Sequence, residues 1–266
     1  MESPVLPDFL IFKRMKLIAP NNIFSSLFYL AIDEKFKPEF LVKESSLIVK
    51  ELLKDQETLA FIPSLDLINH KDLYVSSKFC IGFESYISNS YLYFASAANE
   101  FEKVLLKGDV NTNEVLLSKI IFKEIYNIQP EIELDVYEKF NDAKNYLVSG
   151  NLNWNNNRFG IGISFSEQIT EFLELPYINY LLVSNSKTQL ENFHEQNKDL
   201  LNNLSSNFEQ MIKKINLGEE INDFLITNSD CLIYNFELYG NESYLELVKL
   251  LYFHQILNDM IDVKFV

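Results

Sequence analysis

Four short polar loops carry the residue types that suit the binding of a small organic acid. Each loop follows a short apolar run and contains amides, hydroxyls or glycine. Such groups, together with backbone N–H groups at helix starts, bind a carboxylate without a large cationic patch. The alternative is that the same residues only form turns and helix caps. The candidate ligand-binding residues are Asn21, Ser88, Asn89, Ser90, Asn111, Thr112, Asn113, Gly150 and Asn151.

The third loop lies in residues 103–126, KVLLKGDVNTNEVLLSKIIFKEIY, where a short apolar run precedes a polar turn and an amphipathic pattern. Asn111 is a favourable N-cap, and Glu114 three residues later completes an Asn-x-x-Glu variant of the capping box. A strand, a polar turn and a helix start present free backbone N–H groups to an anion. The other interpretation is a cap that serves only its own helix.

Acid–base chemistry has two candidates. One is His70, for which a solvated loop histidine is the alternative, and the other lies in the loop between two strand-like segments, 79–83 and 90–94. Glu84 begins that loop, and a carboxylate there could act as a general base. An exposed or ion-paired glutamate is the alternative. The three histidines have no metal-ligand spacing, and Cys80 and Cys231 each lie in an apolar run, as buried free thiols do. We expect no metal, and the glycine-rich phosphate-loop patterns do not occur.

Composition narrows the class of protein. The chain has 266 residues, a hydrophobic content of 47% and a formal net charge of −15. This hydrophobic content predicts a folded core, and the negative charge argues against nucleic acid and anionic membrane as partners. The apolar runs are shorter than the ~18 residues of a membrane span. The first residues lack the order of a secretory signal, so we expect a cytoplasmic location.

Short strands and helices alternate along most of the chain, which predicts an α/β fold with a largely parallel sheet. From residue 187 onward the pattern becomes helical, with breaks expected at Gly218 and Gly240. The expected strands are at about 16–19, 40–42, 59–62, 79–83, 90–94, 104–106, 131–134, 146–148 and 177–183. The expected helices are at about 26–33, 46–55, 113–126, 136–141, 165–173, 187–215, 219–227 and 242–253.

Four stretches, in order along the chain, carry a resemblance to a known family. They are TLAFIPSL (58–65), CIGFESYISNSYLYF (80–94), the strand, turn and helix of 105–130, and the segment 142–184 that ends in a Leu-Pro before an apolar strand. In these stretches the chain resembles the chorismate dehydratase family of the futalosine route to menaquinone. That family has the periplasmic-binding-protein-like type II fold.

The resemblance implies two α/β lobes joined by two crossing strands, at about 91–95 and 178–182. Residues 15–95 and 184–266, with a C-terminal helical tail, would form the first lobe, and residues 96–183 the second. A ligand would lie in the cleft between the lobes, where loops converge and closure excludes water. The oligomeric state and the role of residues 1–14 stay open.

The activity implied by the resemblance is a carbon–oxygen lyase reaction, the elimination of water from chorismate or a related acid, without a metal or organic cofactor. The family's Tyr-Leu-Asn turn supplies an asparagine to this reaction. In the gapless match Phe24 stands at that position, and Asn22 takes it if the loop is two residues shorter. Asn22 and Glu84 are therefore the candidate catalytic residues. The alternatives are a non-catalytic solute-binding or sensing protein of the same fold, or a relative with different small-molecule chemistry.

Overall fold

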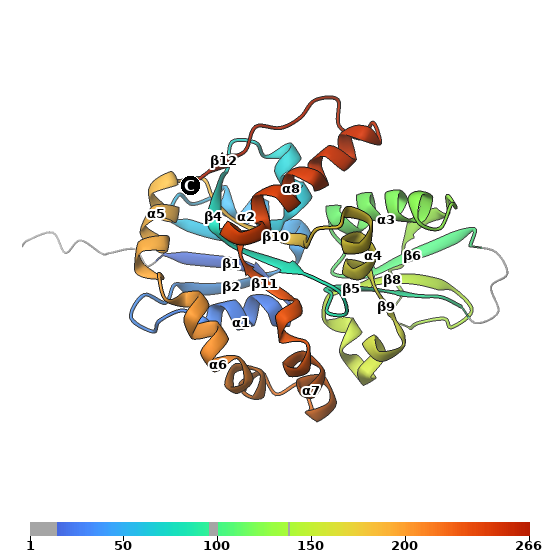
Figure 1. Cartoon of the computed structure of the whole chain (residues 1–266), viewed down its shortest axis with the longest axis horizontal. Helices are drawn as coiled ribbons and strands as arrows, with labels where there is room; N and C mark the ends of the chain where they lie inside the picture. The colour runs from blue at the N-terminus through green and yellow to red at the C-terminus, as the bar shows by residue number, and fades with distance from the viewer. Residues whose placement is uncertain (1–14, 96–100, 138) are drawn as a thin grey trace, which may run out of the picture.

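The computed structural model describes residues 15–95, 101–137 and 139–266. Its strands form two separate sheets, and helices cover the faces of both. Figure 1 shows the sheets as two lobes side by side, joined by chain segments that pass between them. The predicted two-lobed α/β architecture is confirmed.

The larger sheet lies in one lobe and has the strand order β11-β4-β10-β3-β1-β2, with β12 paired to β4. Strands β3 and β10 are buried along their whole length, as expected of near-continuous apolar runs covered on both faces. The strands are β1 (Lys16–Pro20), β2 (Glu39–Lys43), β3 (Thr58–Pro63), β4 (Tyr74–Phe83), β10 (Tyr177–Ser184), β11 (Leu232–Asn235) and β12 (Lys264–Phe265).

The smaller sheet has the order β7-β6-β8-β5-β9. Its strands are β5 (Ser90–Tyr93), β6 (Lys103–Gly108), β7 (Glu131–Leu134), β8 (Asn145–Ser149) and β9 (Ile163–Ser164). Both sheets are mixed, so the expectation of largely parallel pairing is wrong. Strands that enter a sheet after the chain has crossed between lobes run against their neighbours: β5 is antiparallel to β8, and β10 is antiparallel to β3 and β4.

The chain leaves the larger sheet after β4 and enters the smaller sheet at β5, and it returns to the larger sheet at β10. The expected crossing segments, 91–95 and 178–182, thus fall largely within β5 of the smaller sheet and within β10 of the larger one. Below, the two lobes are named by these sheets. The division by residue range given above stays a prediction.

The helices and short 3-10 turns follow most of the expected positions. They are α1 (Ile23–Ala31), η1 (Ser45–Leu47), α2 (Ile48–Leu52), η2 (Ser64–Asn69), α3 (Thr112–Glu124), η3 (Gly150–Asn153), η4 (Asn155–Ile161), α4 (Phe165–Leu173), α5 (Lys187–Gln196), α6 (Leu200–Ile215), α7 (Glu219–Thr227), η5 (Ser229–Cys231) and α8 (Phe236–Phe253). Of the expected helix at 136–141, the described residues form none.

Two helix boundaries differ from expectation for physical reasons. The helix expected over 187–215 is divided, because the Asn197 side chain donates to the carbonyl of Phe193 and ends α5. Gly240 does not break a helix but lies inside α8, where a Cβ would stand 2.1 Å from the Phe236 ring. Glycine there permits close packing of the ring.

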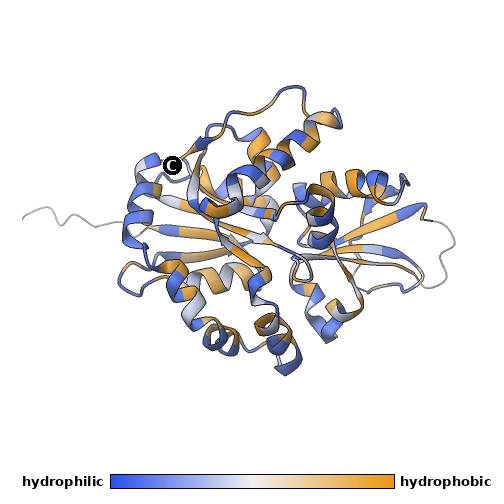
Figure 2. Ribbon diagram, in the orientation of Figure 1, coloured by the Kyte–Doolittle hydropathy of each residue, from blue (hydrophilic) through white to orange (hydrophobic). Residues whose placement is uncertain are grey.

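The C-terminal helix α8 packs on the larger sheet through Leu247, Val248 and Leu251, which are fully buried. Figure 2 shows apolar residues concentrated along the strands and on the inward sides of the helices. Burial of such side chains stabilises the fold by about 25 cal/mol per Å² of apolar surface. Within the described ranges, no helix has the length and apolar character to cross a membrane.

Candidate ligand-binding cleft

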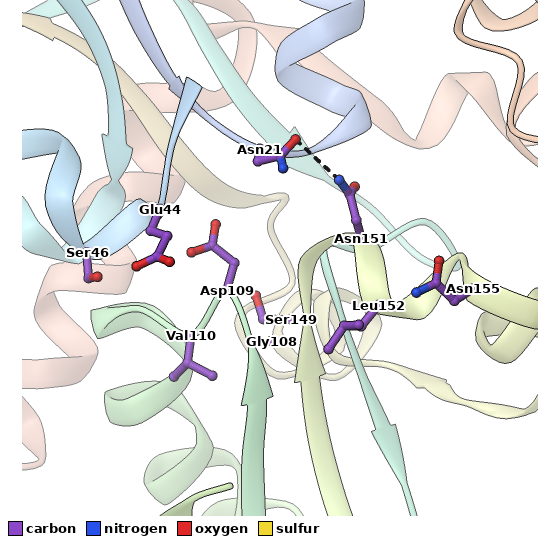
Figure 3. A pocket seen from close by; sticks show the side chains of 10 residues that line it. All are labelled: Asn21, Glu44, Ser46, Gly108, Asp109, Val110, Ser149, Asn151, Leu152 and Asn155. Atoms are coloured by element: carbon purple, nitrogen blue, oxygen red, sulfur yellow. Dashed lines mark hydrogen bonds between the residues drawn. The ribbon is translucent and has the colours of Figure 1, made fainter. Parts of the chain in front are cut away.

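A cavity of about 380 Å³ lies between the two lobes (Figure 3). Loops that follow strands of both sheets line it, and seven of its ten lining residues have polar side chains. The loop after β1 and the loop after β2 contribute from the larger sheet, and the loops after β6 and β8 contribute from the smaller one. The lining residues are Asn21, Glu44, Ser46, Gly108, Asp109, Val110, Ser149, Asn151, Leu152 and Asn155.

Parallel pairing explains why these loops meet. Strands β1 and β2 are parallel, as are β6 and β8, so in each sheet the carboxyl ends of the pair reach the same edge. Ligands of open α/β sheets bind at such edges. At Gly108 the backbone of β6 passes very close to that of β8. Gly108 has a φ of +91°, and a Cβ there would stand 2.0 Å from the carbonyl oxygen of Ser149, so the position requires glycine.

Direct hydrogen bonds join the lobes at the edge of this cavity. The carboxylate of Asp109, from the smaller-sheet lobe, accepts from the backbone N–H of Ser45 at 2.9 Å and from its hydroxyl at 2.7 Å. The Nδ2 of Asn151 lies 3.5 Å from the Oδ1 of Asn21, as Figure 3 shows. The two lobes are therefore in contact around the cavity through side chains of the protein itself.

The cavity is acidic. Glu44 and Asp109 are the only ionisable side chains among its lining residues, and Figure 3 shows the two carboxylates close together. Burial raises the pKa of Asp109, the bonds from Ser45 oppose this rise, and the neighbouring charge of Glu44 adds to it. These two carboxylates set the sign of the local potential, since no lysine, arginine or histidine side chain lines the cavity.

The start of α3 has a different environment. Its capping box is complete: Asn111 accepts from the N–H of Asn113 at 2.9 Å, and Glu114 accepts from the N–H of Asn111 at 3.0 Å. The Asn113 side chain also accepts from the N–H of Leu65 and donates to the carbonyl of Asn179. The Thr112 hydroxyl donates to the carboxylate of Asp66, a hydrogen bond between the lobes.

Asn111, Thr112 and Asn113 thus bond to the protein rather than line the cavity. The same is true of the residues at the crossing into β5. The Ser88 hydroxyl lies 2.7 Å from that of Ser166, and the amide of Asn89 donates to Ser149 and to Tyr180. These bonds hold the loop in place behind the cavity wall.

Glu114 is the fully buried carboxyl group of this region. Its Oε1 accepts from the hydroxyl of Ser90 at 2.8 Å and from the hydroxyl of Ser149 at 3.3 Å. Burial raises its pKa from 4.5 to about 7, although the bonds from Ser90 and from the Asn111 N–H act in the opposite direction. Because Ser149 also lines the cavity, Glu114 lies one hydroxyl group away from it.

The two candidate catalytic residues lie outside the cavity lining. Asn22 is the N-cap of α1 and accepts from the N–H of Ser25 at 2.9 Å. Glu84 is half-buried at the end of β4, where its N–H donates to the carbonyl of Cys231 at 2.8 Å. Of the predicted ligand-binding residues, Asn21 and Asn151 line the cavity, and Gly150, whose N–H donates to the carbonyl of Asn89, adjoins it.

Sequence reasoning did not select Glu44 or Asp109 as site residues. Both follow the last residues of predicted strands, so a systematic survey of strand ends would have found them. The other lining residues that were missed are Ser46, Gly108, Val110, Ser149, Leu152 and Asn155. The described part of the chain holds no group of three or more His, Cys, Asp or Glu residues that could hold a metal ion.

A larger groove of about 500 Å³ lies between η4, β9 and α4 on one side and α7 on the other. Its walls are largely aromatic and apolar, with Tyr86, Tyr91, Phe159 and Phe224 among them. It lacks the convergence of several polar loops at strand ends. The acidic cavity is therefore the stronger candidate for a specific site.

Comparison with solved structures identifies the fold. The chain resembles protein AF1704 from Archaeoglobus fulgidus, with a TM-score of 0.65 and 11% identity over 91% of this chain and 98% of that one. It resembles the Candida albicans CA3427 gene product, described as exhibiting the generic periplasmic binding protein fold, with a TM-score of 0.62 and 9% identity over 92% and 91% of the two chains.

The periplasmic aliphatic sulphonate binding protein SsuA from Escherichia coli gives a TM-score of 0.60 and 9% identity over 94% of this chain and 90% of SsuA. No protein-family model and no curated protein sequence matches the chain. The protein thus has a two-lobed periplasmic-binding-protein-like type II fold with a C-terminal helical tail. At these identities the likeness defines the fold alone.

Proposed function

We propose that the protein binds one small organic molecule in the cavity between its lobes. The observation that carries this proposal is the convergence of polar loops from both sheets on one cavity of about 380 Å³. This volume suits a small organic ligand, and side chains from both lobes would contact it at once. A ligand held in this way favours the closed arrangement of the lobes.

The fold supports this proposal. The sulphonate binding protein SsuA, of the same fold, is named for a small-molecule ligand. For the present chain, the groups available for binding are the amides of Asn21, Asn151 and Asn155 and the hydroxyl of Ser46. Val110 and Leu152 add apolar contact surface.

Thermal unfolding with a panel of small polar molecules tests the proposal. A ligand at 100 times its Kd stabilises the native state by about 2.7 kcal/mol, which raises the Tm. Asn151→Trp fills the cavity and should abolish the rise in Tm, whereas Lys119→Trp, at an exposed position of α3, should leave it unchanged. Equal stabilisation of the wild type and Asn151→Trp would place the ligand elsewhere and refute the proposal.

The chorismate dehydratase activity implied by the sequence resemblance is the second candidate. One observation favours it: Glu114, with a pKa of about 7, is linked to the cavity through Ser149 and could exchange a proton near neutral pH. The reaction would remove a ring hydroxyl and a ring proton from a dicarboxylate as water. The acidic lining of the cavity counts against binding of such a dianion.

Incubation of the protein with chorismate, followed by its diene absorbance, tests this second candidate. Turnover that falls at least tenfold in Glu114→Gln and in Ser90→Ala, but not in Glu39→Gln, would support it. Glu39 is an exposed carboxylate at the start of β2, remote from the cavity lining. If the wild type does not turn over chorismate, the lyase hypothesis is wrong and ligand binding without catalysis is the function that stands.

A further inference from the structure

We infer that the ligand of this cavity is a small organic cation rich in hydrogen-bond donors, such as an amine, and not an organic acid. The inference rests on the proposed function and specifies the ligand class of the same site. Glu44 and Asp109 are the ionisable residues of the lining, and both are carboxylates. Figure 3 shows them at one end of the cavity, so a ligand bound there meets two negative charges at once.

The electrostatic cost of this arrangement is relieved by a cation. Two carboxylates held close together in a partly enclosed site repel each other, which is why the charge of Glu44 adds to the rise in the pKa of Asp109. An ammonium group placed between them attracts both and donates hydrogen bonds to their oxygens. A ligand carboxylate in the same place would add a third negative charge.

Two of the backbone N–H groups that could hold an anion near this cavity are already occupied by carboxylates of the protein. Helix starts are the usual anion sites of such folds, and several lie near this cavity. The carboxylate of Asp109 takes the N–H of Ser45 at the start of η1, and the carboxylate of Glu114 takes the N–H of Asn111 before α3. An acidic ligand would have to displace the carboxylates of the protein from these positions.

The shape of the cavity favours an organic cation over a metal ion. A volume of about 380 Å³ far exceeds the space of a single ion, and Val110 and Leu152 offer apolar contact to methylene groups. Figure 3 shows Asn151 and Asn155 farther from Glu44, and their side-chain carbonyl oxygens can accept from a second donor of the ligand. A short aliphatic chain with an amine at each end matches this distribution of acceptors.

Isothermal titration calorimetry with matched probes tests the inference. The probes are 1,4-diaminobutane and succinate, which share a four-carbon chain and differ in charge, with calcium chloride as the metal arm, all at constant ionic strength. We expect the diamine to bind and succinate and calcium not to bind. Glu44→Gln and Asp109→Asn should each weaken diamine binding at least tenfold, and Glu39→Gln should change it less than twofold.

The outcomes separate this inference from the proposed function. Binding of succinate that is lost in Asn151→Trp overturns the inference and keeps the cavity as the site. Diamine binding that persists in both Asn151→Trp and Glu44→Gln overturns the inference alone, because the diamine then binds elsewhere and the cavity is still open to another ligand. No diamine binding, or calcium binding that depends on Glu44, overturns the inference.

Discussion

Two parts of the surface between the lobes use similar residues in opposite ways. At the start of α3, which we call the docked part, Asn111, Asn113 and Glu114 are buried and bond to the protein itself. In the cavity, which we call the open part, Asn21, Glu44 and Asn151 are exposed, and their side chains surround free volume. The docked part joins the lobes, and the open part is left to a ligand.

The difference shows how a polar turn acquires its role. Asparagine and glutamate at the start of α3 satisfy the free N–H groups of their own helix, and Asn113 also reaches the opposite lobe. Groups with bonding partners of this kind contribute to stability and are not available to a ligand. In the open part the long Asn21–Asn151 bond and the Asp109–Ser45 pair link the lobes.

The largest effect on stability is expected at Gly108, which lines the cavity and lies just before the turn into α3. Gly108→Ala introduces a Cβ 2.0 Å from the carbonyl of Ser149 at a φ of +91°. We expect a loss of about 4 kcal/mol in the free energy of unfolding, from backbone strain and overpacking together. Urea unfolding measures it. Gly218→Ala, with a φ of +101° but open space, isolates the strain, and Gly160→Ala is the neutral control.

Removal of the buried carboxyl of Glu114 tests the docked part. Glu114→Ala leaves the Ser90 hydroxyl and the Asn111 N–H without their acceptor, so we expect a loss of about 3 kcal/mol in the free energy of unfolding. Glu114→Gln keeps an acceptor oxygen and should lose less than half as much. A loss below about 1 kcal/mol in Glu114→Ala would show that these groups find other partners.

The raised pKa of Glu114 predicts a pH dependence of stability. Folding raises the pKa from 4.5 to about 7, so the folded protein retains a proton that the unfolded chain releases. The stabilisation is fully present below pH 4.5 and is lost as the pH rises through 7. Between pH 5 and 8 we expect the difference in unfolding free energy between wild type and Glu114→Gln to change by about 2 kcal/mol.

If the unfolding free energies of wild type and Glu114→Gln change equally with pH, then Glu114 has the same pKa in the folded and the unfolded protein, and the prediction is wrong. Repulsion among the acidic groups of the chain also changes with pH, but it acts on wild type and on Glu114→Gln alike, so it cancels in the difference between them.

The smallest effect is expected in the open part. Asn21→Ala and Asn151→Ala each remove one exposed contact of 3.5 Å, so their unfolding free energies should stay within about 0.5 kcal/mol of wild type. Their ligand affinity should fall instead. Thermal unfolding with and without ligand separates the two effects. If either variant loses more than about 1 kcal/mol of unfolding free energy without ligand, its asparagine stabilises the fold as the residues of the docked part do, and the two parts do not differ.

The fold was predictable where local patterns are strong. The capping box at Asn111 and Glu114 placed α3 to within two residues at each end, and the apolar run that forms β10 was identified as a central strand. The direction of β5 and β10 was not predictable, because it depends on where the chain crosses between lobes. The break at Asn197 depends on a single side-chain bond that a periodic pattern does not reveal.

The site was predictable only in part. Polar turns at strand ends identified Asn21 and Asn151, which line the cavity. The same signal identified Asn111 and Asn113, which bond across the lobes, because a turn sequence does not tell which partner its side chains meet. Glu44 and Asp109 were missed because an acidic residue after a strand is common in a chain of net charge −15.

The bond between Asp109 and Ser45 has a consequence for how a ligand changes the protein. A carboxylate of the protein itself joins the lobes here, so this contact is made by the protein's own groups. A ligand shifts the balance between open and closed forms only by its difference in affinity for them. Where the closed form is already abundant, binding costs little in conformational free energy, and little motion is left to report it.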